Sequence, residues 1–143
     1  MTKRPFLALV LIAAGGVAQA GERAAAVVAC DATQERLSYT CAITLKGRKS
    51  GDPILADRLL VKPAMPSMMM AHNLPPAIAM PVDGKPGHYM TSFELEMFGE
   101  WSLAIEVNGK LANSGARVRD KVIVKREFGA PSGEGDGQRK ATE

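Results

Sequence analysis

Apolar and polar residues alternate with a period of two along much of this chain. The clearest examples are residues 89–95 and 101–107, where side chains such as Phe93, Trp101 and Ile105 occupy every second position. Successive side chains of a strand point to opposite sides, so this alternation gives an extended segment one apolar face. It predicts half-buried β-strands, and no long segment has the 3.6-residue period of an amphipathic helix.

Further segments also have the pattern or composition of strands. Residues 37–45 alternate larger apolar with smaller or polar side chains, and Val122 and Val124 share the inward face of the last segment. Six prolines within residues 63–86 exclude a helix or a central strand there, which leaves residues 77–82 as a short edge strand. The other expected strands are residues 24–30, 58–63 and 118–127.

Turn signals between these segments indicate the architecture. The polar stretch 31–36, Gly99 and the dipeptide Asn108-Gly109 separate neighbouring strands. About seven short strands, spaced by roughly 8 to 15 residues, predict an all-β domain, an antiparallel immunoglobulin-like β-sandwich of two sheets. A small closed barrel is the alternative architecture.

The N-terminus has the three parts of an export signal. Lys3 and Arg4 precede an apolar run, which ends with the small residues Ala18 and Ala20 at the cleavage positions. The apolar run is shorter than the roughly 20 residues that a transmembrane helix needs. Residues 1–20 are therefore predicted to be a signal peptide, with an uncleaved anchor as the alternative.

Cleavage after the signal leaves a length that fits a single domain. We expect the sandwich in residues 21–128 and a disordered tail in residues 129–143, which are glycine-rich, polar and charged. The signal removes two of the 18 basic residues, so 16 remain against 15 acidic ones and nothing suggests a nucleic-acid partner. The predicted location is the periplasm or the extracellular space, with no membrane span after cleavage.

Two cysteines, Cys30 and Cys41, lie in the exported part of the chain. An even number of cysteines in an oxidising compartment indicates a disulfide, and a hairpin centred near Glu35 and Arg36 would place the two opposite one another. Closing so short a loop stabilises a fold by about 3 kcal/mol in the chain-entropy model. The alternative is a thiolate metal or redox site, although the spacing matches neither a CxxC motif nor a zinc knuckle.

Methionine and histidine are concentrated in one part of the sequence. All seven methionines after the signal, and both histidines, lie between Met65 and Met97. Thioether sulfur is a soft ligand that favours Cu(I), and imidazole also binds copper. Thiolates are easily oxidised outside the cytoplasm, so methionine and histidine are the ligands that a copper site can keep there. The clustering therefore predicts a copper site, with Cu(I) as the favoured ion.

Two short motifs supply the candidate metal ligands. Met68, Met70 and His72 share one face if their segment is extended, and His88 and Met90 share one face of the next strand. If the proline-rich segment folds against the start of that strand, the pairs Met70–His72 and His88–Met90 bring two nitrogens and two sulfurs to one Cu(I) ion.

Packing and docking are the alternatives to a metal site. Methionine fills irregular gaps beside prolines, and on this interpretation Met80 and Met97 are core residues, while Met65 and Met69 also serve packing. An exposed position in a turn is the simpler interpretation of His88. A methionine patch on the surface would instead dock a membrane or efflux protein.

No motif in the sequence indicates catalysis. The acidic residues are spaced as on strand surfaces or in loops, and a nucleophile-base pattern, a phosphate-binding loop and an HExxH run are all missing. We therefore expect a binding protein and not an enzyme.

Three runs of residues resemble the YtkA-like domain family, which is related in pattern to FixH proteins. They are Met-Pro-Ser-Met-Met-Met-Ala-His at residues 65–72, Pro-Gly-His-Tyr at residues 86–89 and Met-Phe-Gly-Glu-Trp-Ser-Leu at residues 97–103. The similarity covers about residues 57–108. It implies an exported or membrane-tethered immunoglobulin-like sandwich, often linked to copper handling or to the assembly of copper oxidases.

The resemblance also implies roles for single residues. Gly87 and Tyr89 would shape a turn and a buried corner, and Gly99 with Trp101 would set a strand and its core anchor. The methionine-histidine run would supply metal ligands. The expected partners are a copper ion and a membrane copper transporter or oxidase-assembly protein, although the predicted cleavage after Ala20 would leave this chain without the uncleaved anchor of FixH proteins.

Overall fold

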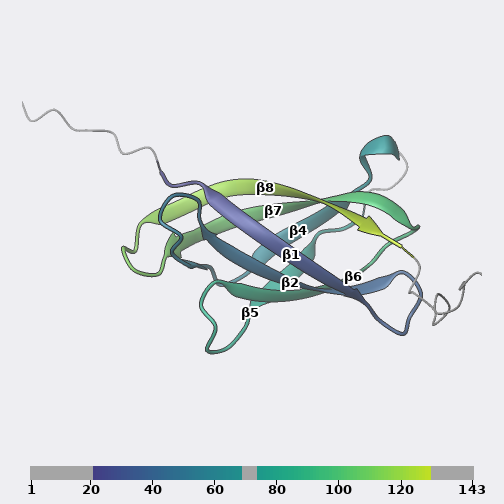
Figure 1. The fold of residues 1–143 in the computed structure, drawn as a ribbon, viewed down its shortest axis with the longest axis horizontal. Coiled ribbons are helices and arrows are strands. Elements are labelled where there is room, and N and C mark those ends of the chain that lie inside the picture. Colours follow the sequence, from purple (N-terminus) through teal and green to yellow (C-terminus); the bar gives the residue numbers. More distant parts are fainter. Residues whose placement is uncertain (1–20, 69–73, 130–143) are drawn as a thin grey trace, which may run out of the picture.

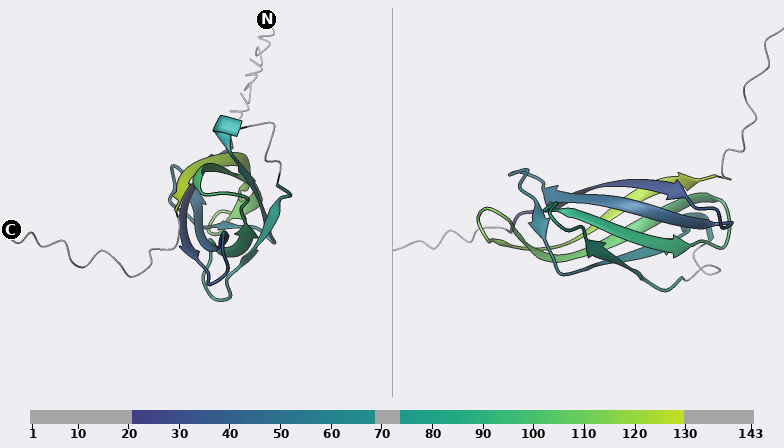
Figure 2. Two further views of the ribbon diagram at one scale, coloured as in Figure 1. Left: turned by 90° about the vertical axis from the view of Figure 1, so that its right-hand side faces the viewer. Right: turned by 90° about the horizontal axis from the view of Figure 1, so that it is seen from below.

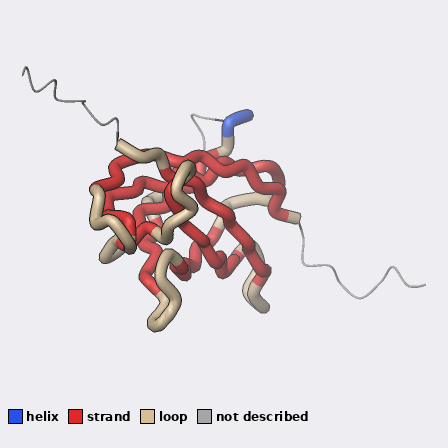
Figure 3. Tube along the Cα trace, turned by 60° about the vertical axis from the view of Figure 1, so that its left-hand side comes forward, coloured by secondary structure: helices blue, strands red, loops and turns tan. Residues whose placement is uncertain are grey.

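The computed structural model describes residues 21–68 and 74–129, and these form an all-β domain. The predicted signal peptide and all but the first residue of the predicted tail lie outside the described residues. Strands make up nearly all of the regular structure, and one short 3₁₀ helix projects from one end (Figure 3). The elements are β1 (Ala24–Ala32), β2 (Ser38–Gly47), β3 (Ile54–Leu55), β4 (Leu59–Ala64), η1 (Pro66–Met68), β5 (Ala77–Pro81), β6 (His88–Glu94), β7 (Gly99–Leu111) and β8 (Arg117–Phe128).

The strands form two antiparallel layers that pack face to face. One layer has the order β1-β2-β6-β5, and the other has β4-β7-β8, with β3 also paired to β7 (Figure 1). This order is that of the constant-type immunoglobulin sandwich, in which four strands face three. The predicted antiparallel immunoglobulin-like sandwich is confirmed.

The strand expected at residues 77–82 is present as β5, but it is not a free edge strand. It joins the two layers along one side. Ala77 to Ala79 pair with β4 of one layer, whereas Met80 and Pro81 pair with β6 of the other. The prolines are tolerated because Pro81 is the last residue of β5, Pro75 and Pro76 precede the strand, and Pro86 lies in the turn that follows it. On the opposite side β8 lies beside β1, where Asp120 accepts a hydrogen bond from the Ala24 amide at 3.0 Å. The cross-section is therefore rounded (Figure 2).

The core is built from the inward positions of the predicted alternating segments. Trp101 is fully buried at its centre, and its indole Nε1 donates a hydrogen bond to the Met97 carbonyl at 3.1 Å. Val122 and Val124 are partly buried against this core, as expected. The largest fully buried side chains also include Tyr89, Ile43, Leu45, Ile54, Leu59, Leu103 and Ile105.

The cysteine prediction is confirmed. Cys30 and Cys41 form a disulfide, and they are directly opposite one another in the β1–β2 hairpin, with Cα atoms 4.0 Å apart. The register of the two strands centres the hairpin between Glu35 and Arg36. The bond therefore joins neighbouring strands of one layer, whereas the disulfide of antibody domains joins the two layers.

The predicted turn at Asn108-Gly109 is wrong. Strand β7 continues through both residues to Leu111, and the turn that follows is closed by a hydrogen bond from the Gly115 amide to the Leu111 carbonyl at 2.9 Å. The glycine is needed for a different reason: a Cβ at Gly109 would collide with the backbone carbonyl of Leu55 in β3. Gly109 therefore permits the close approach of β3 to β7.

Candidate metal site

The methionines occupy several different environments. Met65 is buried, which confirms its packing role, but Met80 is 56% exposed and Met97 is 37% exposed. The expectation that these two residues belong to the core is therefore wrong. Met80 is exposed because its neighbour Ala79 faces the core, and alternation then directs Met80 outward. Met69, for which packing was also expected, lies outside the described residues, as do Met70 and His72.

Strand β6 presents His88 and Met90 on its outer face, as the sequence predicts. Both side chains are exposed, whereas Tyr89 and Thr91 on the other face are buried. The Tyr89 hydroxyl donates a hydrogen bond to the Ile54 carbonyl at 2.7 Å and accepts one from the Ala56 amide at 2.8 Å. These bonds hold the inward face of β6 in place and thereby fix which residues point outward.

Met80 in β5 is the cross-strand neighbour of Met90. The two are directly opposite one another in the β5–β6 ladder, and their side chains are exposed. On the β2 side, the residue opposite Met90 is Ala42, whose small side chain leaves the Met90 thioether uncovered. The three exposed residues Met80, His88 and Met90 are called the Met-His face below. No sequence prediction included Met80 among the ligands.

The His88 ring is positioned by Thr44 of β2. The two residues are opposite one another in the ladder, and Nδ1 lies 3.4 Å from the threonine Oγ1. Histidines that bind metals commonly use their second ring nitrogen in such a hydrogen bond, which orients the ring. This contact fits a ring that presents Nε2 to a ligand.

A tight hairpin turn fixes the start of β6. The His88 amide donates to the Lys85 carbonyl at 3.1 Å, and the Val82 amide donates to the His88 carbonyl at 2.9 Å. Gly87 has a φ of 79°, and a Cβ there would lie 2.7 Å from the Leu45 carbonyl oxygen, so only glycine fits. The turn role expected for Gly87 and the buried position expected for Tyr89 agree with these contacts.

Met68 lies at the other end of the domain from His88. It is the last residue of η1, which contacts the beginning of β7, and its side chain is 42% exposed. The beginning of β7 follows the last residue of β6 in the chain, whereas His88 is the first residue of β6. The two ends of β6 are about 20 Å apart along the strand. The structure thus brings His88 and Met90 together with Met80, and it does not bring Met68 to His88.

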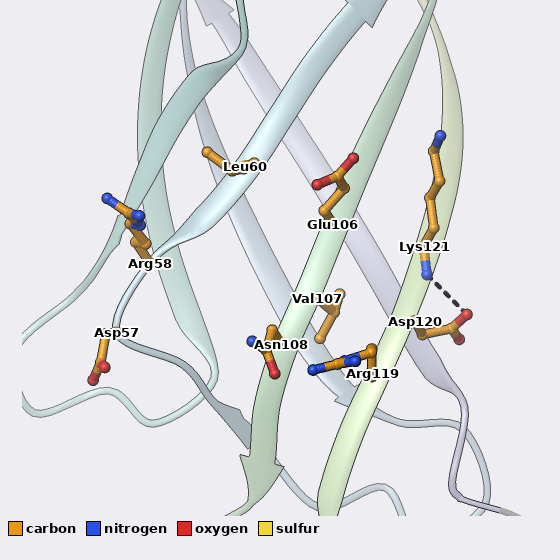
Figure 4. A pocket seen from close by; sticks show the side chains of 9 residues that line it. All are labelled: Asp57, Arg58, Leu60, Glu106, Val107, Asn108, Arg119, Asp120 and Lys121. Atoms are coloured by element: carbon orange, nitrogen blue, oxygen red, sulfur yellow. Dashed lines mark hydrogen bonds between the residues drawn. The ribbon is translucent and has the colours of Figure 1, made fainter.

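A concave region lies on the outer face of the layer that contains β4, β7 and β8. It is a groove of about 610 Å³ beside β4, β7 and β8 (Figure 4). Three acidic and three basic side chains line it, so its charge is balanced and favours neither an anion nor a cation. The charged residues are Asp57, Glu106, Asp120, Arg58, Arg119 and Lys121.

A hard metal site needs several oxygen or nitrogen ligands. Within residues 21–68 and 74–129, no three or more histidine, cysteine, aspartate or glutamate side chains are arranged to hold a metal ion. In the same residues no helix is long and apolar enough to cross a membrane.

The fold and the Met-His face define an immunoglobulin-like sandwich with a disulfide-linked hairpin and a soft-ligand cluster on one layer. No family model matches the chain, and no curated protein matches it. The resemblance to the YtkA-like family therefore stays a prediction from the residues that carry it.

Proposed function

We propose that this chain is an exported copper-binding or copper-delivery module that holds Cu(I) through thioether and imidazole groups. The observation that carries the proposal is the pair His88 and Met90, which share the exposed face of β6. Imidazole nitrogen and thioether sulfur are ligands suited to Cu(I), and neither group has to lose an interaction in the core to bind it.

The disulfide supports the exported location. A bond between Cys30 and Cys41 persists in oxidising compartments such as the periplasm, and it removes both thiols of the chain from metal binding. A copper ion in an oxidising compartment therefore needs ligands that are not thiols and are not easily oxidised. The resemblance to the YtkA-like family, with its link to copper handling and oxidase assembly, points in the same direction.

The proposal includes the second sequence motif as a separate ligand group. Met68, Met70 and His72 would form this group; Met68 lies at the η1 end of the domain, and Met70 and His72 lie outside the described residues. The cargo would pass to or from a membrane copper transporter or an oxidase-assembly protein. No catalytic step is part of the proposal.

A competition titration tests the proposed function. The purified protein, kept with its disulfide intact, is titrated with Cu(I) against a chromophoric Cu(I) chelator, beside the variants His88→Ala/Met90→Ala and Met68→Ala/Met70→Ala/His72→Ala. The wild type should withdraw Cu(I) from the chelator, and at least one variant should lose that ability. Equal and weak competition by all three proteins would end the copper proposal.

Docking of a protein partner is the second candidate function. An apolar row crosses the outer face of one layer, because Ala29, Ala42, Met90 and Met80 are successive cross-strand neighbours and all are exposed. Exposed apolar rows of this kind mark interaction surfaces. If docking is the function, the protein should not bind Cu(I), and substitution of Met80 or Met90 should weaken binding of the partner.

A further inference from the structure

We infer that Met80 is the third ligand of a Cu(I) site on the Met-His face, with one imidazole nitrogen from His88 and two thioether sulfurs from Met80 and Met90. The inference rests on the proposed copper function and assigns its ligand set. It uses only residues that the structure describes, and it adds Met80, which was not among the ligands predicted from the sequence.

The register of β5 and β6 places the three side chains around one point. Met80 and Met90 are directly opposite one another, a relationship that puts Cβ atoms about 5 Å apart. His88 is two residues from Met90 on the same face, about 7 Å along the strand, and is therefore the diagonal neighbour of Met80. Two flexible thioethers and one oriented ring can reach a common ion across these distances.

The surroundings of the three side chains leave the site open on one side. Met90 is 41% exposed and Met80 is 56% exposed, and the neighbour of Met90 in β2 is the small residue Ala42. Thr44 meets His88 through Nδ1, so the ring is anchored on the side away from the methionines. A partner that offers a further soft ligand can therefore approach a bound ion from solvent.

The chemistry of the three ligands selects the ion. Two thioethers and one neutral imidazole form a soft set with no negative charge, which suits Cu(I) and not the harder divalent ions that need carboxylate or carbonyl oxygen. A three-coordinate Cu(I) ion can exchange ligands one at a time without a change of oxidation state. The site therefore fits transfer of Cu(I) to another soft-ligand protein.

Methyl resonances of methionine provide the direct test. The protein is labelled with ¹³C at the methionine methyl groups and titrated with Ag(I), which is a redox-inert substitute for Cu(I), and then with Cu(I) under anaerobic conditions. The methyl signals of Met80 and Met90 should move together within the first equivalent. The signals of buried Met65 and exposed Met97 should stay in place.

An affinity comparison accompanies the spectra. Met80→Leu keeps the shape of the side chain without sulfur and should weaken Cu(I) binding at least tenfold, the scale on which single groups at metal sites act. Met97→Leu is the matched control, because Met97 is exposed but lies in the connection between β6 and β7, past the end of β6 that is opposite His88, and the Cu(I) affinity of this variant should equal that of the wild type. Thermal unfolding of both variants checks that each is folded.

The outcomes separate this inference from the proposed function. If the Met68 and Met70 signals move while the Met80 signal does not, the chain binds copper and the three-ligand site is wrong. If Met90 moves alone and Met80→Leu binds Cu(I) as the wild type does, Met80 is not a ligand. If no methyl signal moves with either ion, both the inference and the proposed copper function fail.

Discussion

Met80 and Met90 are directly opposite one another on β5 and β6, and both thioethers lie on the outer face of the sandwich. Methionine is among the residues that are most often fully buried in folded proteins. Here the buried neighbours Ala79 and Tyr89 face inward and leave the sulfur atoms to solvent. The proposed soft-metal site depends on this cross-strand pair.

The hydrogen bond between Thr44 and His88 should influence metal affinity through the orientation of the ring. We predict that Thr44→Val weakens Cu(I) binding by about tenfold, because the valine keeps the shape but cannot hold Nδ1. A Cu(I) competition titration measures the change. Thr40→Val is the control, since Thr40 makes the equivalent contact with Ser92 on the same pair of strands at 3.1 Å, but Ser92 is not a proposed ligand and lies beyond Met90 from His88. Equal losses in both variants would contradict a specific role for Thr44.

The disulfide should contribute substantially to stability. Replacement of Cys30 and Cys41 by alanine is expected to lower the free energy of unfolding by about 3 kcal/mol, the scale of closing a short loop in the chain-entropy model. Urea unfolding followed by tryptophan fluorescence of the buried Trp101 reports the change. An unchanged midpoint would show that the hairpin is held by its strand pairing alone.

The hydroxyl of Tyr89 should make stability depend on alkaline pH. Burial raises the pKa of Tyr89, although the hydrogen bond from the Ala56 amide opposes the shift. The native state therefore favours the neutral phenol, so its stabilising effect is complete below the unfolded pKa near 10 and is lost as the pH rises through the higher folded pKa. Unfolding midpoints measured from pH 8 to pH 11 should fall in the wild type.

The variant Tyr89→Phe separates the hydroxyl from the ring. It should lose about 1–3 kcal/mol at neutral pH, because the Ile54 carbonyl and the Ala56 amide lose their hydrogen bonds to the hydroxyl. Its alkaline decline should be smaller than in the wild type but not zero, since burial also raises the pKa of Tyr39. An identical decline in both proteins would assign the effect to other groups.

The strands and the disulfide could be predicted from the sequence because both depend on local patterns. Period-two alternation identified the inward face of β6 and β7, and the position of Cys30 relative to Cys41 fixed the centre of their hairpin. The Asn108-Gly109 dipeptide gave a wrong prediction of a turn because a turn signal is read from neighbouring residues alone. Gly109 is instead required by the close backbone of β3, which is distant in sequence.

The exposed position of Met80 was missed because it depends on a register that alternation does not supply. Alternation alone does not show which face of the short β5 is exposed, and Met80 was assigned to the core. A signal for the correct register was present: Asp83-Gly84-Lys85-Pro86-Gly87 is rich in turn residues, and a hairpin centred on Lys85 puts Met80 opposite Met90.

X-ray absorption at the copper edge of the Cu(I)-loaded protein identifies the atoms that bind the ion. Both cysteines are joined in the disulfide, so any sulfur bound to copper must be a methionine thioether. We predict two sulfur neighbours and one nitrogen neighbour around the ion, with loss of one sulfur in Met80→Leu. A coordination shell of nitrogen and oxygen alone would contradict the account.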